Sequence, residues 1–186
     1  LDEFTKLFYT QLDKKALIID DRMNGGGNVS PMIIERLQRE VYRMNMYRNG
    51  SEGLATIPES THHGPKVCLV DKYSSSDGDL FPYGFQKLGI GPLIGTRTWG
   101  GIVGISGSKP YVDGQDVRTP FFTSYSTDGK WILENEGVTP DIYVDINPFE
   151  DYLGNDAQLN KAVEVLLEQI KTYPQLPGVP APRVMD

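Results

Sequence analysis

Residues 66–82 read KVCLVDKYSSSDGDLFP. The apolar run from Val67 to Val70 predicts a buried strand, because continuous apolar strands are typical of a sheet covered on both faces. Three serines and an Asp-Gly-Asp turn follow, which predict a corner and the first turn of a helix. A serine at such a corner can present its hydroxyl to a substrate, beside helix N–H groups that favour negative charge. An ordinary solvated turn with a helix cap has the same composition, so these residues alone leave the role of the serines open.

Strand–loop–helix order occurs twice in the first half of the chain. The earlier unit contains the loop Asn24-Gly-Gly-Gly-Asn28, and Ser30-Pro31 supplies the cap and the first residue of its helix. The expected elements are a helix over residues 1–15, strands over 16–19, 66–70 and 93–95, helices over 30–43 and 77–88, and a weakly structured loop over 48–65. Strands that alternate with helices predict an α/β fold with a mostly parallel sheet and packed helices.

The second half of the chain has a different pattern. Gly-rich turns alternate with short strands such as residues 130–133, so residues 96–146 are expected to be rich in β-hairpins. Residues 155–173 have an apolar face at helical spacing and predict a closing helix. Residues 1–173 are therefore expected to form one domain, followed by a Pro-rich flexible tail over residues 174–186.

The composition excludes several classes of protein. The 186 residues carry a net charge of −7, whereas nucleic-acid binding needs clustered Lys and Arg, so no nucleic-acid partner is expected. No apolar stretch is long enough to cross a bilayer, so no membrane partner is expected either. Cys68 is the single cysteine and is expected to be a core side chain, which excludes an internal disulfide and a zinc–thiolate site. We expect neither a metal nor a cofactor.

Two loops of the predicted sheet can form a catalytic site together. Loops that follow parallel strands lie at the carboxyl ends of the strands, where ligands bind in open α/β sheets. Residues 25–27, all glycine, offer unobstructed backbone N–H groups, and the second loop offers Ser76 and the N–H of Asp77. Together they would supply a nucleophile and a two-donor oxyanion hole, which acyl transfer requires. The alternative for the glycines is a phosphate-binding or merely tight loop, although they match neither common nucleotide-binding pattern.

A serine nucleophile needs a base, and the sequence close to Ser76 offers none. His62 and His63 come just before the strand that leads to Ser76. A strand of this length rises by about 17 Å, so both imidazoles are expected at the opposite edge of the sheet, as surface loop residues. Glu134 follows an apolar strand and can orient a base or a water in the same cleft, whereas Glu136 is interpreted as part of a solvated turn.

Four motifs, read in order, resemble a known family. They are Asp21-Arg22-x-Asn24-Gly25-Gly26-Gly27, Ser76-Asp77-Gly78-Asp79, Gly95-Thr96-Arg97-Thr98-Trp99-Gly100-Gly101 and Glu134-Asn135-x-Gly137-Val138-x-Pro140-Asp141. This set resembles the C-terminal catalytic subdomain of the tricorn protease family, which belongs with the C-terminal processing peptidases. The resemblance extends from about residue 4 to about residue 173 and implies a ClpP/crotonase-like fold and a serine peptidase.

The resemblance implies roles residue by residue. Ser76 aligns with the nucleophile, and the backbone N–H groups of Gly27 and Asp77 align with the oxyanion hole. Glu134 aligns with the acidic member of a Ser-His-Ser-Glu tetrad. The family's His and other Ser lie in an upstream subdomain, before a PDZ-like domain, and nothing in this sequence matches them. The chain is therefore expected to carry half of an active site, and to hydrolyse peptides or unfolded protein only within a full-length protein that forms homo-oligomers.

Three further residues, Gly26, Asn45 and Gly101, are expected to contact the substrate. Archaeal tricorn has an Asp at the position of Asn45 that favours basic side chains at the cleavage site. The Asn45 amide keeps the hydrogen-bonding capacity without the charge, so the resemblance does not imply a basic preference here. Two other functions stay open: a non-catalytic ligand- or peptide-binding module of the same fold, and an acyl-CoA enzyme of the crotonase type. The lack of a basic patch for the CoA phosphates argues against the second.

Overall fold

A parallel sheet of four strands lies at the centre of the fold, and the computed structural model describes residues 1–47, 55–106 and 110–181. The strand order is β1 (Leu17–Asp20), β4 (Lys66–Val70), β5 (Leu93–Gly95) and β8 (Ile142–Tyr143), and every pair is parallel. β4 is buried along its whole length, because it has a strand on each edge and its side chains pack in cores on both faces. The strands predicted over 66–70 and 93–95 are confirmed, and the first strand begins one residue later than predicted.

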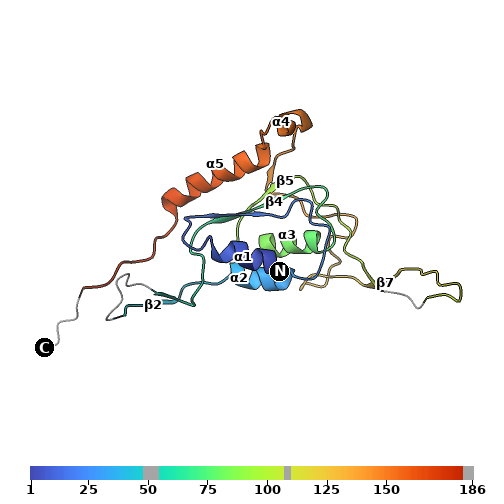
Figure 1. Cartoon of the computed structure of the whole chain (residues 1–186), viewed down its shortest axis with the longest axis horizontal. Helices are drawn as coiled ribbons and strands as arrows, with labels where there is room; N and C mark the ends of the chain where they lie inside the picture. Colours follow the sequence, from blue (N-terminus) through green and yellow to red (C-terminus); the bar gives the residue numbers. More distant parts are fainter. Residues whose placement is uncertain (48–54, 107–109, 182–186) are drawn as a thin grey trace.

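Helices cover both faces of this sheet (Figure 1). On one side lie α1 (Asp2–Tyr9), α2 (Ser30–Leu37) and α3 (Asp77–Lys87), and on the other side lies α5 (Ala157–Thr172). Side chains of β4 alternate between the two faces: Cys68 and Val70 pack in the core with α1 to α3, whereas Val67 and Leu69 pack in the core with α5. The predicted α/β fold is confirmed, and Cys68 is a fully buried free thiol of the core, as expected.

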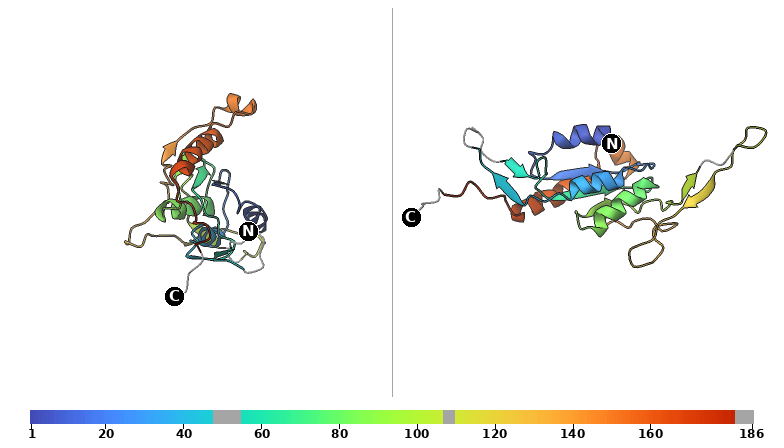
Figure 2. Two further views of the ribbon diagram at one scale, coloured as in Figure 1. Left: turned by 90° about the vertical axis from the view of Figure 1, so that its left-hand side faces the viewer. Right: turned by 90° about the horizontal axis from the view of Figure 1, so that it is seen from below.

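Two antiparallel ribbons extend from opposite ends of the molecule (Figures 1 and 2). One ribbon consists of β2 (Arg43–Asn45) and β3 (Ala55–Ile57), and the other of β6 (Gly104–Ser106) and β7 (Thr119–Phe122). The second ribbon fits the hairpin-rich segment that the sequence predicted. The strand predicted over residues 130–133 is wrong, because Trp131 forms an isolated bridge with Tyr125 and the backbone turns into the left-handed region at Leu133 (φ 66°).

The second predicted helix ends at Leu37 rather than near Arg43. Arg43 instead lies in β2, opposite Ile57 of β3. Pairing with β3 therefore overrides the helical spacing of the sequence. β3 falls within residues 48–65, which the sequence predicted to be a weakly structured loop; residues 48–54 of that stretch lie outside the described residues.

The first and last helices are also shorter than predicted. α1 ends at Tyr9 and is followed by turns, whereas the sequence predicted a helix to residue 15. α5 lies within the predicted range, and the Asp156 carboxylate accepts the N–H of Leu159 (2.9 Å) as its N-terminal cap. A short helix, α4 (Pro148–Tyr152), precedes it. The described part of the Pro-rich tail, residues 174–181, contains neither helix nor strand.

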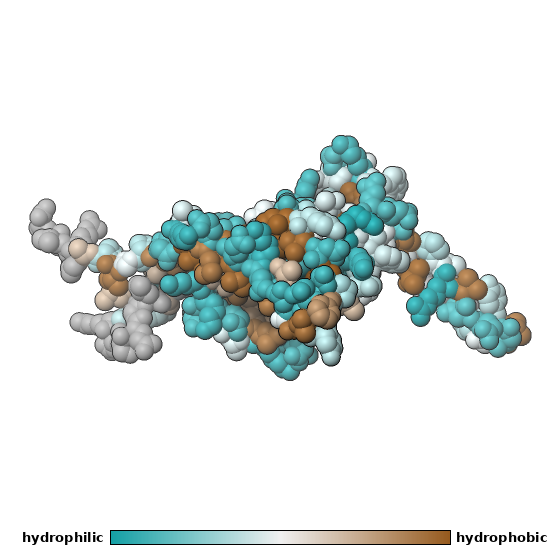
Figure 3. All heavy atoms as spheres, turned by 90° about the horizontal axis from the view of Figure 1, so that it is seen from above, coloured by the Kyte–Doolittle hydropathy of each residue, from teal (hydrophilic) through white to brown (hydrophobic). Residues whose placement is uncertain are grey.

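The outer face of α5 carries apolar side chains among polar ones. Ala162 and Leu166 of this helix are buried against the sheet, whereas Leu159, Val163 and Leu167 are exposed. Figure 3, which views the side of the molecule occupied by α5, shows apolar side chains dispersed between hydrophilic ones. Among the described residues, no helix is both long enough and apolar enough to cross a membrane.

Candidate active site

Ser76 lies at the corner between β4 and α3, as the N-terminal cap residue of the helix. Its backbone has φ 57° and ψ −116°, a conformation that residues other than glycine rarely adopt. Holding a serine there costs on the order of 1–3 kcal/mol, which the surrounding contacts must offset. A sharp, strained turn from strand to helix is also how α/β hydrolases present a nucleophilic serine. The backbone at Ser76 is therefore the first structural indication of a functional role.

The glycine loop packs directly on this corner, as the sequence predicted. A Cβ atom placed on Gly26 would lie 2.7 Å from Cβ and 3.0 Å from Oγ of Ser76, and the φ of Gly26 is +118°. The carbonyl oxygen of Asn24 accepts the N–H of Ser75 (2.8 Å), and a Cβ on Gly78 would lie 2.2 Å from the same oxygen. The two loops are thus in contact through backbone atoms, and only glycine fits at the closest points.

The backbone N–H groups at the corner differ in their hydrogen bonding, and two of them have no acceptor in the described chain. The N–H of Ser76 donates to the carbonyl oxygen of Gly101 (3.1 Å) and to Oδ2 of Asp79 (3.1 Å). The N–H groups of Gly27 and Asp77 have no acceptor among the described residues. These are the two donors that the sequence assigned to an oxyanion hole, and they lie on the two segments that meet at Ser76.

The Asp77 carboxylate connects the glycine loop to α3. Its Oδ2 accepts the N–H groups of Val29 (2.9 Å) and Ser30 (3.1 Å) at the start of α2. The Ser30 hydroxyl donates in return to the carbonyl oxygen of Asp77 (3.3 Å). Otherwise unpaired N–H groups at a helix N-terminus favour a negative charge, so this carboxylate stabilises α2. It also holds Gly27 near the start of α3, because Gly27 lies two residues before Val29.

Glu134 lies against the segment that carries Gly101. Its Oε2 accepts the N–H groups of Ile102 (2.8 Å) and Val103 (3.0 Å). The N–H of the next residue, Asn135, donates to the carbonyl oxygen of Gly100 (2.7 Å). Since Gly101 accepts the N–H of Ser76, a chain of direct contacts connects Glu134 to the corner. Glu134 and Gly101 are therefore brought to the same region as Ser76.

Asn45, one of the predicted site residues, does not lie at the Ser76 corner. Asn45 lies in β2, opposite Ala55 of β3, on the ribbon that extends from the other end of the molecule (Figure 1). It lines a groove of about 280 Å³ together with residues 176–180 of the tail. Within the described chain, Asn45 and Ser76 therefore lie in different regions. A role of Asn45 in substrate binding stays a prediction.

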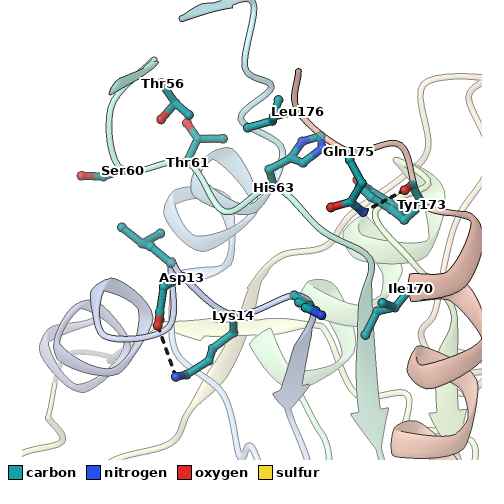
Figure 4. A pocket seen from close by; sticks show the side chains of 12 residues that line it. Asp13, Lys14, Thr56, Ser60, Thr61, His63, Ile170, Tyr173, Gln175 and Leu176 are labelled. Carbon is teal, nitrogen blue, oxygen red and sulfur yellow. Dashed lines mark hydrogen bonds and ion pairs between the residues drawn. The ribbon is translucent and has the colours of Figure 1, made fainter. Parts of the chain in front are cut away.

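The two histidines also lie away from Ser76, at the start of β4. His62 is 3% exposed and its Nε2 donates to the carbonyl oxygen of Lys14 (2.9 Å), so the prediction of a surface residue is wrong for His62. Burial, together with the charge of Lys66, lowers the pKa of His62 to about 4. His63 lines a cavity of about 480 Å³ beside Tyr173 (Figure 4). Its Nε2 donates to the carbonyl oxygen of Pro174 (2.7 Å). In each histidine, one ring nitrogen is therefore hydrogen-bonded to a backbone carbonyl oxygen.

Asp79 is a site residue that the sequence did not single out by itself. Its carboxylate accepts the N–H groups of Gly100 (2.8 Å), Gly101 (3.0 Å) and Ser76 (3.1 Å), and its side chain is completely buried. The signal that could have indicated it is the Ser-x-x-Asp spacing, in which the third helical residue reaches back to the N–H of the cap residue. No group of His, Cys, Asp and Glu that could hold a metal ion occurs among the described residues.

Comparison with known proteins gives the family. The family model of peptidase family S41 matches residues 1–144. The chain belongs to peptidase family S41. The S41 chain is 37% identical over 182 residues to tricorn protease of Thermoplasma acidophilum, a match that covers 97% of the chain and 17% of the relative. It is 39% identical over 171 residues to a tricorn protease homolog of Saccharolobus solfataricus, with 90% of the chain and 16% of the relative covered.

The fold comparison agrees with the family. The S41 chain superposes on the crystal structure of a tricorn protease with a TM-score of 0.86 and 37% identity, over 92% of the chain and 16% of that structure. The resemblance drawn from the four motifs is therefore confirmed, together with the fold that it implied. The chain spans about one sixth of the length of the tricorn relatives that it matches.

The buried side chain of Asp21 is connected to the glycine loop of the S41 chain through Asn24. Asp21 follows β1 and is 6% exposed; its Oδ1 accepts the Asn24 amide (2.8 Å), and Oδ2 has no partner among the described residues. The Asn24 side-chain oxygen in turn accepts the N–H of Gly26 (3.0 Å). Burial, with smaller contributions from neighbouring carboxylates, raises the pKa of Asp21 to about 8, although the hydrogen bond from Asn24 opposes this. Asp21 is thus a neutral acid at pH 7.

This titration predicts how stability depends on pH. The folded chain keeps the Asp21 proton up to about pH 8, whereas the unfolded chain loses it near pH 4. Folding therefore binds a proton between these values, and the stability of the wild type falls as the pH rises through this window. The substitution Asp21→Asn removes the titration. We expect Asp21→Asn to gain stability relative to the wild type from pH 4 to pH 8, on the order of 5 kcal/mol at most.

Thermal unfolding of the 186-residue chain at several pH values measures this gain. The exposed Asp151, on α4, is the matched control, and Asp151→Asn should follow the wild type across the same range. Parallel curves for Asp21→Asn and the wild type would contradict a raised pKa at Asp21.

Proposed function

We propose that the chain is the part of a serine peptidase that supplies the nucleophile, the oxyanion hole and an acidic residue. The observation that carries this proposal is the corner at Ser76. A strained serine lies there beside two N–H groups, those of Gly27 and Asp77, that have no acceptor in the described chain. A hydroxyl and two backbone N–H donors are what acyl transfer needs at one carbonyl group. Membership of peptidase family S41 and the tricorn relatives support the same reaction.

In this proposal Ser76 Oγ attacks the carbonyl carbon of a peptide bond. The carbonyl oxygen becomes an oxyanion and accepts hydrogen bonds from the N–H groups of Gly27 and Asp77. A base takes the Ser76 proton and passes it to the leaving amine, which leaves an acyl group on Oγ. Water then attacks the acyl carbon, the bond from this carbon to Oγ breaks, the carboxylic acid product leaves, and Ser76 recovers its proton. In this proposal the chain would contribute the attacking oxygen and the two donors to these steps.

The base in this scheme comes from outside the chain. Both histidines lie at the start of β4, beyond the opposite end of the strand from Ser76. We therefore propose that a subdomain upstream in a longer protein supplies the His and a second Ser, as the resemblance implies. Glu134 would orient these groups: its Oε2 is held by Ile102 and Val103, while Oε1 accepts no hydrogen bond from the described residues. The isolated chain would then hydrolyse peptides poorly, if at all.

The proposed substrates are peptides or unfolded protein. A PDZ-like domain and a homo-oligomer belong to the same proposal for the longer protein, because the chain covers 17% of its tricorn relative. A basic preference at the cleavage site is not proposed, because Asn45 carries no charge.

Labelling with a fluorophosphonate tests the proposal. In the longer protein we expect one covalent adduct, which mass mapping should place on Ser76, because this reagent phosphonylates an activated serine. The isolated 186-residue chain is the control and should label far more slowly, since it lacks the base. A folded longer protein that does not label at Ser76 would instead favour a non-catalytic binding module of the same fold.

A further inference from the structure

We propose that Asp79 is a positioning residue that sets the nucleophile and the acidic residue of the site relative to each other. The inference rests on the proposed roles of Ser76 and Glu134. Asp79 lies on the first turn of α3 and does not face a substrate, because its side chain is completely buried. It acts through the backbone groups that it binds.

One carboxylate joins two segments that are far apart in the sequence. Oδ1 of Asp79 accepts the N–H of Gly100 (2.8 Å), and Oδ2 accepts the N–H groups of Gly101 (3.0 Å) and Ser76 (3.1 Å). A buried carboxylate is stable only when its oxygens are hydrogen-bonded, and bonds to an ionised acceptor are short and strong. Asp79 therefore favours a single arrangement of the Ser76 corner and the Gly100–Gly101 loop.

On the side of the nucleophile, Asp79 controls which N–H groups face the substrate. The N–H of Ser76 is shared between Asp79 and the carbonyl oxygen of Gly101, so it does not face the oxyanion position. The N–H of the following residue, Asp77, stays without an acceptor in the described chain. Loss of the Asp79 contact would release the Ser76 N–H and let the strained corner relax.

On the side of the acid, the same contacts fix the loop that holds Glu134. Gly100 and Gly101 are followed directly by Ile102 and Val103, whose N–H groups hold Oε2 of Glu134. The carbonyl oxygen of Gly100 also accepts the N–H of the residue after Glu134 (2.7 Å). A displacement of the Gly100–Gly101 loop would therefore move Glu134. Reactions that depend on positioned groups lose about 100-fold for a displacement of about 1 Å.

The substitution Asp79→Asn tests this inference in the longer protein. Asparagine keeps one acceptor oxygen but places an NH₂ group against one of the N–H donors, so at least one of the three contacts is lost. We expect the rate of fluorophosphonate labelling at Ser76 and kcat to fall by about 100-fold, with KM within about threefold of the wild type. Rates are compared on the folded fraction, well below the thermal midpoint of each variant.

The matched control is Asp141→Asn. Asp141 also accepts a backbone N–H, from Leu93 (2.7 Å), and the Gln86 amide (3.0 Å), but it lies by the end of α3 that is remote from Ser76. It should lower stability without a comparable change in kcat. An equal loss of kcat in both variants, or a wild-type labelling rate in Asp79→Asn, would overturn the inference and leave the proposed function intact.

Two further measurements separate the remaining outcomes. If Ser76→Ala still labels at the wild-type rate, the proposed function itself fails. If Asp79→Asn does not fold, amide hydrogen exchange of the wild-type protein tests the role of Asp79 instead. We expect the amide protons of Ser76, Gly100 and Gly101 to exchange slowly, as in β4, because a buried carboxylate binds them. Exchange as fast as in exposed loops would overturn the role of Asp79.

Discussion

Ser76→Ala in the longer protein is expected to lower kcat/KM for a peptide substrate by about 10⁴-fold or more. The substitution removes the oxygen that would form the acyl intermediate, and the N–H groups at the corner alone leave only a small residual rate. The fold should be preserved, because the corner is held by backbone contacts and by the carboxylates of Asp77 and Asp79. Steady-state kinetics with a fluorogenic peptide, together with circular dichroism, measure both effects.

The neighbouring serine is the matched control. Ser75 is in the same turn and its N–H donates to the carbonyl oxygen of Asn24, a contact that Ser75→Ala retains. Ser75→Ala should keep kcat/KM within a few-fold of the wild type. Substantial hydrolysis by Ser76→Ala would remove Ser76 from the role of nucleophile.

Gly26→Ala should have the second largest effect, on activity and stability together. The φ of +118° at Gly26 is unfavourable for alanine, which costs on the order of 1–3 kcal/mol. The new methyl group would lie 2.7 Å from Cβ and 3.0 Å from Oγ of Ser76, so either the glycine loop or Ser76 must move. Because this movement would also displace one of the two proposed oxyanion donors relative to the other, we expect kcat/KM to fall by about 100-fold or more.

Gly25→Ala is the matched control for Gly26→Ala, since it adds the same methyl group one residue earlier. A Cβ on Gly25 has no heavy atom within 4 Å. Gly25→Ala should therefore leave kinetics and thermal stability close to those of the wild type. Similar losses in Gly25→Ala and Gly26→Ala would show that the loop tolerates no side chain for reasons other than contact with Ser76.

Much of the fold could be predicted because its signals are local. The strand Lys66–Val70 is a continuous apolar run between turn residues, and α3 begins at a cap residue followed by acidic residues. The meeting of the glycine loop with Ser76 follows from topology, since both loops come after adjacent parallel strands. These features need no knowledge of distant contacts.

The features that were missed depend on contacts between distant residues. Arg43 continues a helical pattern in the sequence, and only its partner Ile57, in a loop-like stretch, places it in a strand. His62 reads as a loop residue, yet the carbonyl of Lys14 and the surrounding chain bury it. Asp79 looks like the third helical residue of an ordinary capping box, because its partners Gly100 and Gly101 are about 20 residues away.

The two functions of Asp77 limit what mutagenesis can measure at this site. Its main-chain N–H is a proposed oxyanion donor, while its side chain holds the N-terminus of α2 through Val29 and Ser30. Any substitution at Asp77 other than proline changes the second function and keeps the first, so its kinetic effect reports on the glycine loop rather than on the donor. Proline would remove the donor and the carboxylate together, so the donor alone can be removed only by chemistry on the backbone, such as an ester in place of the Ser76–Asp77 amide. Protein synthesis with an α-hydroxy acid is therefore the route to the oxyanion contribution in this protein.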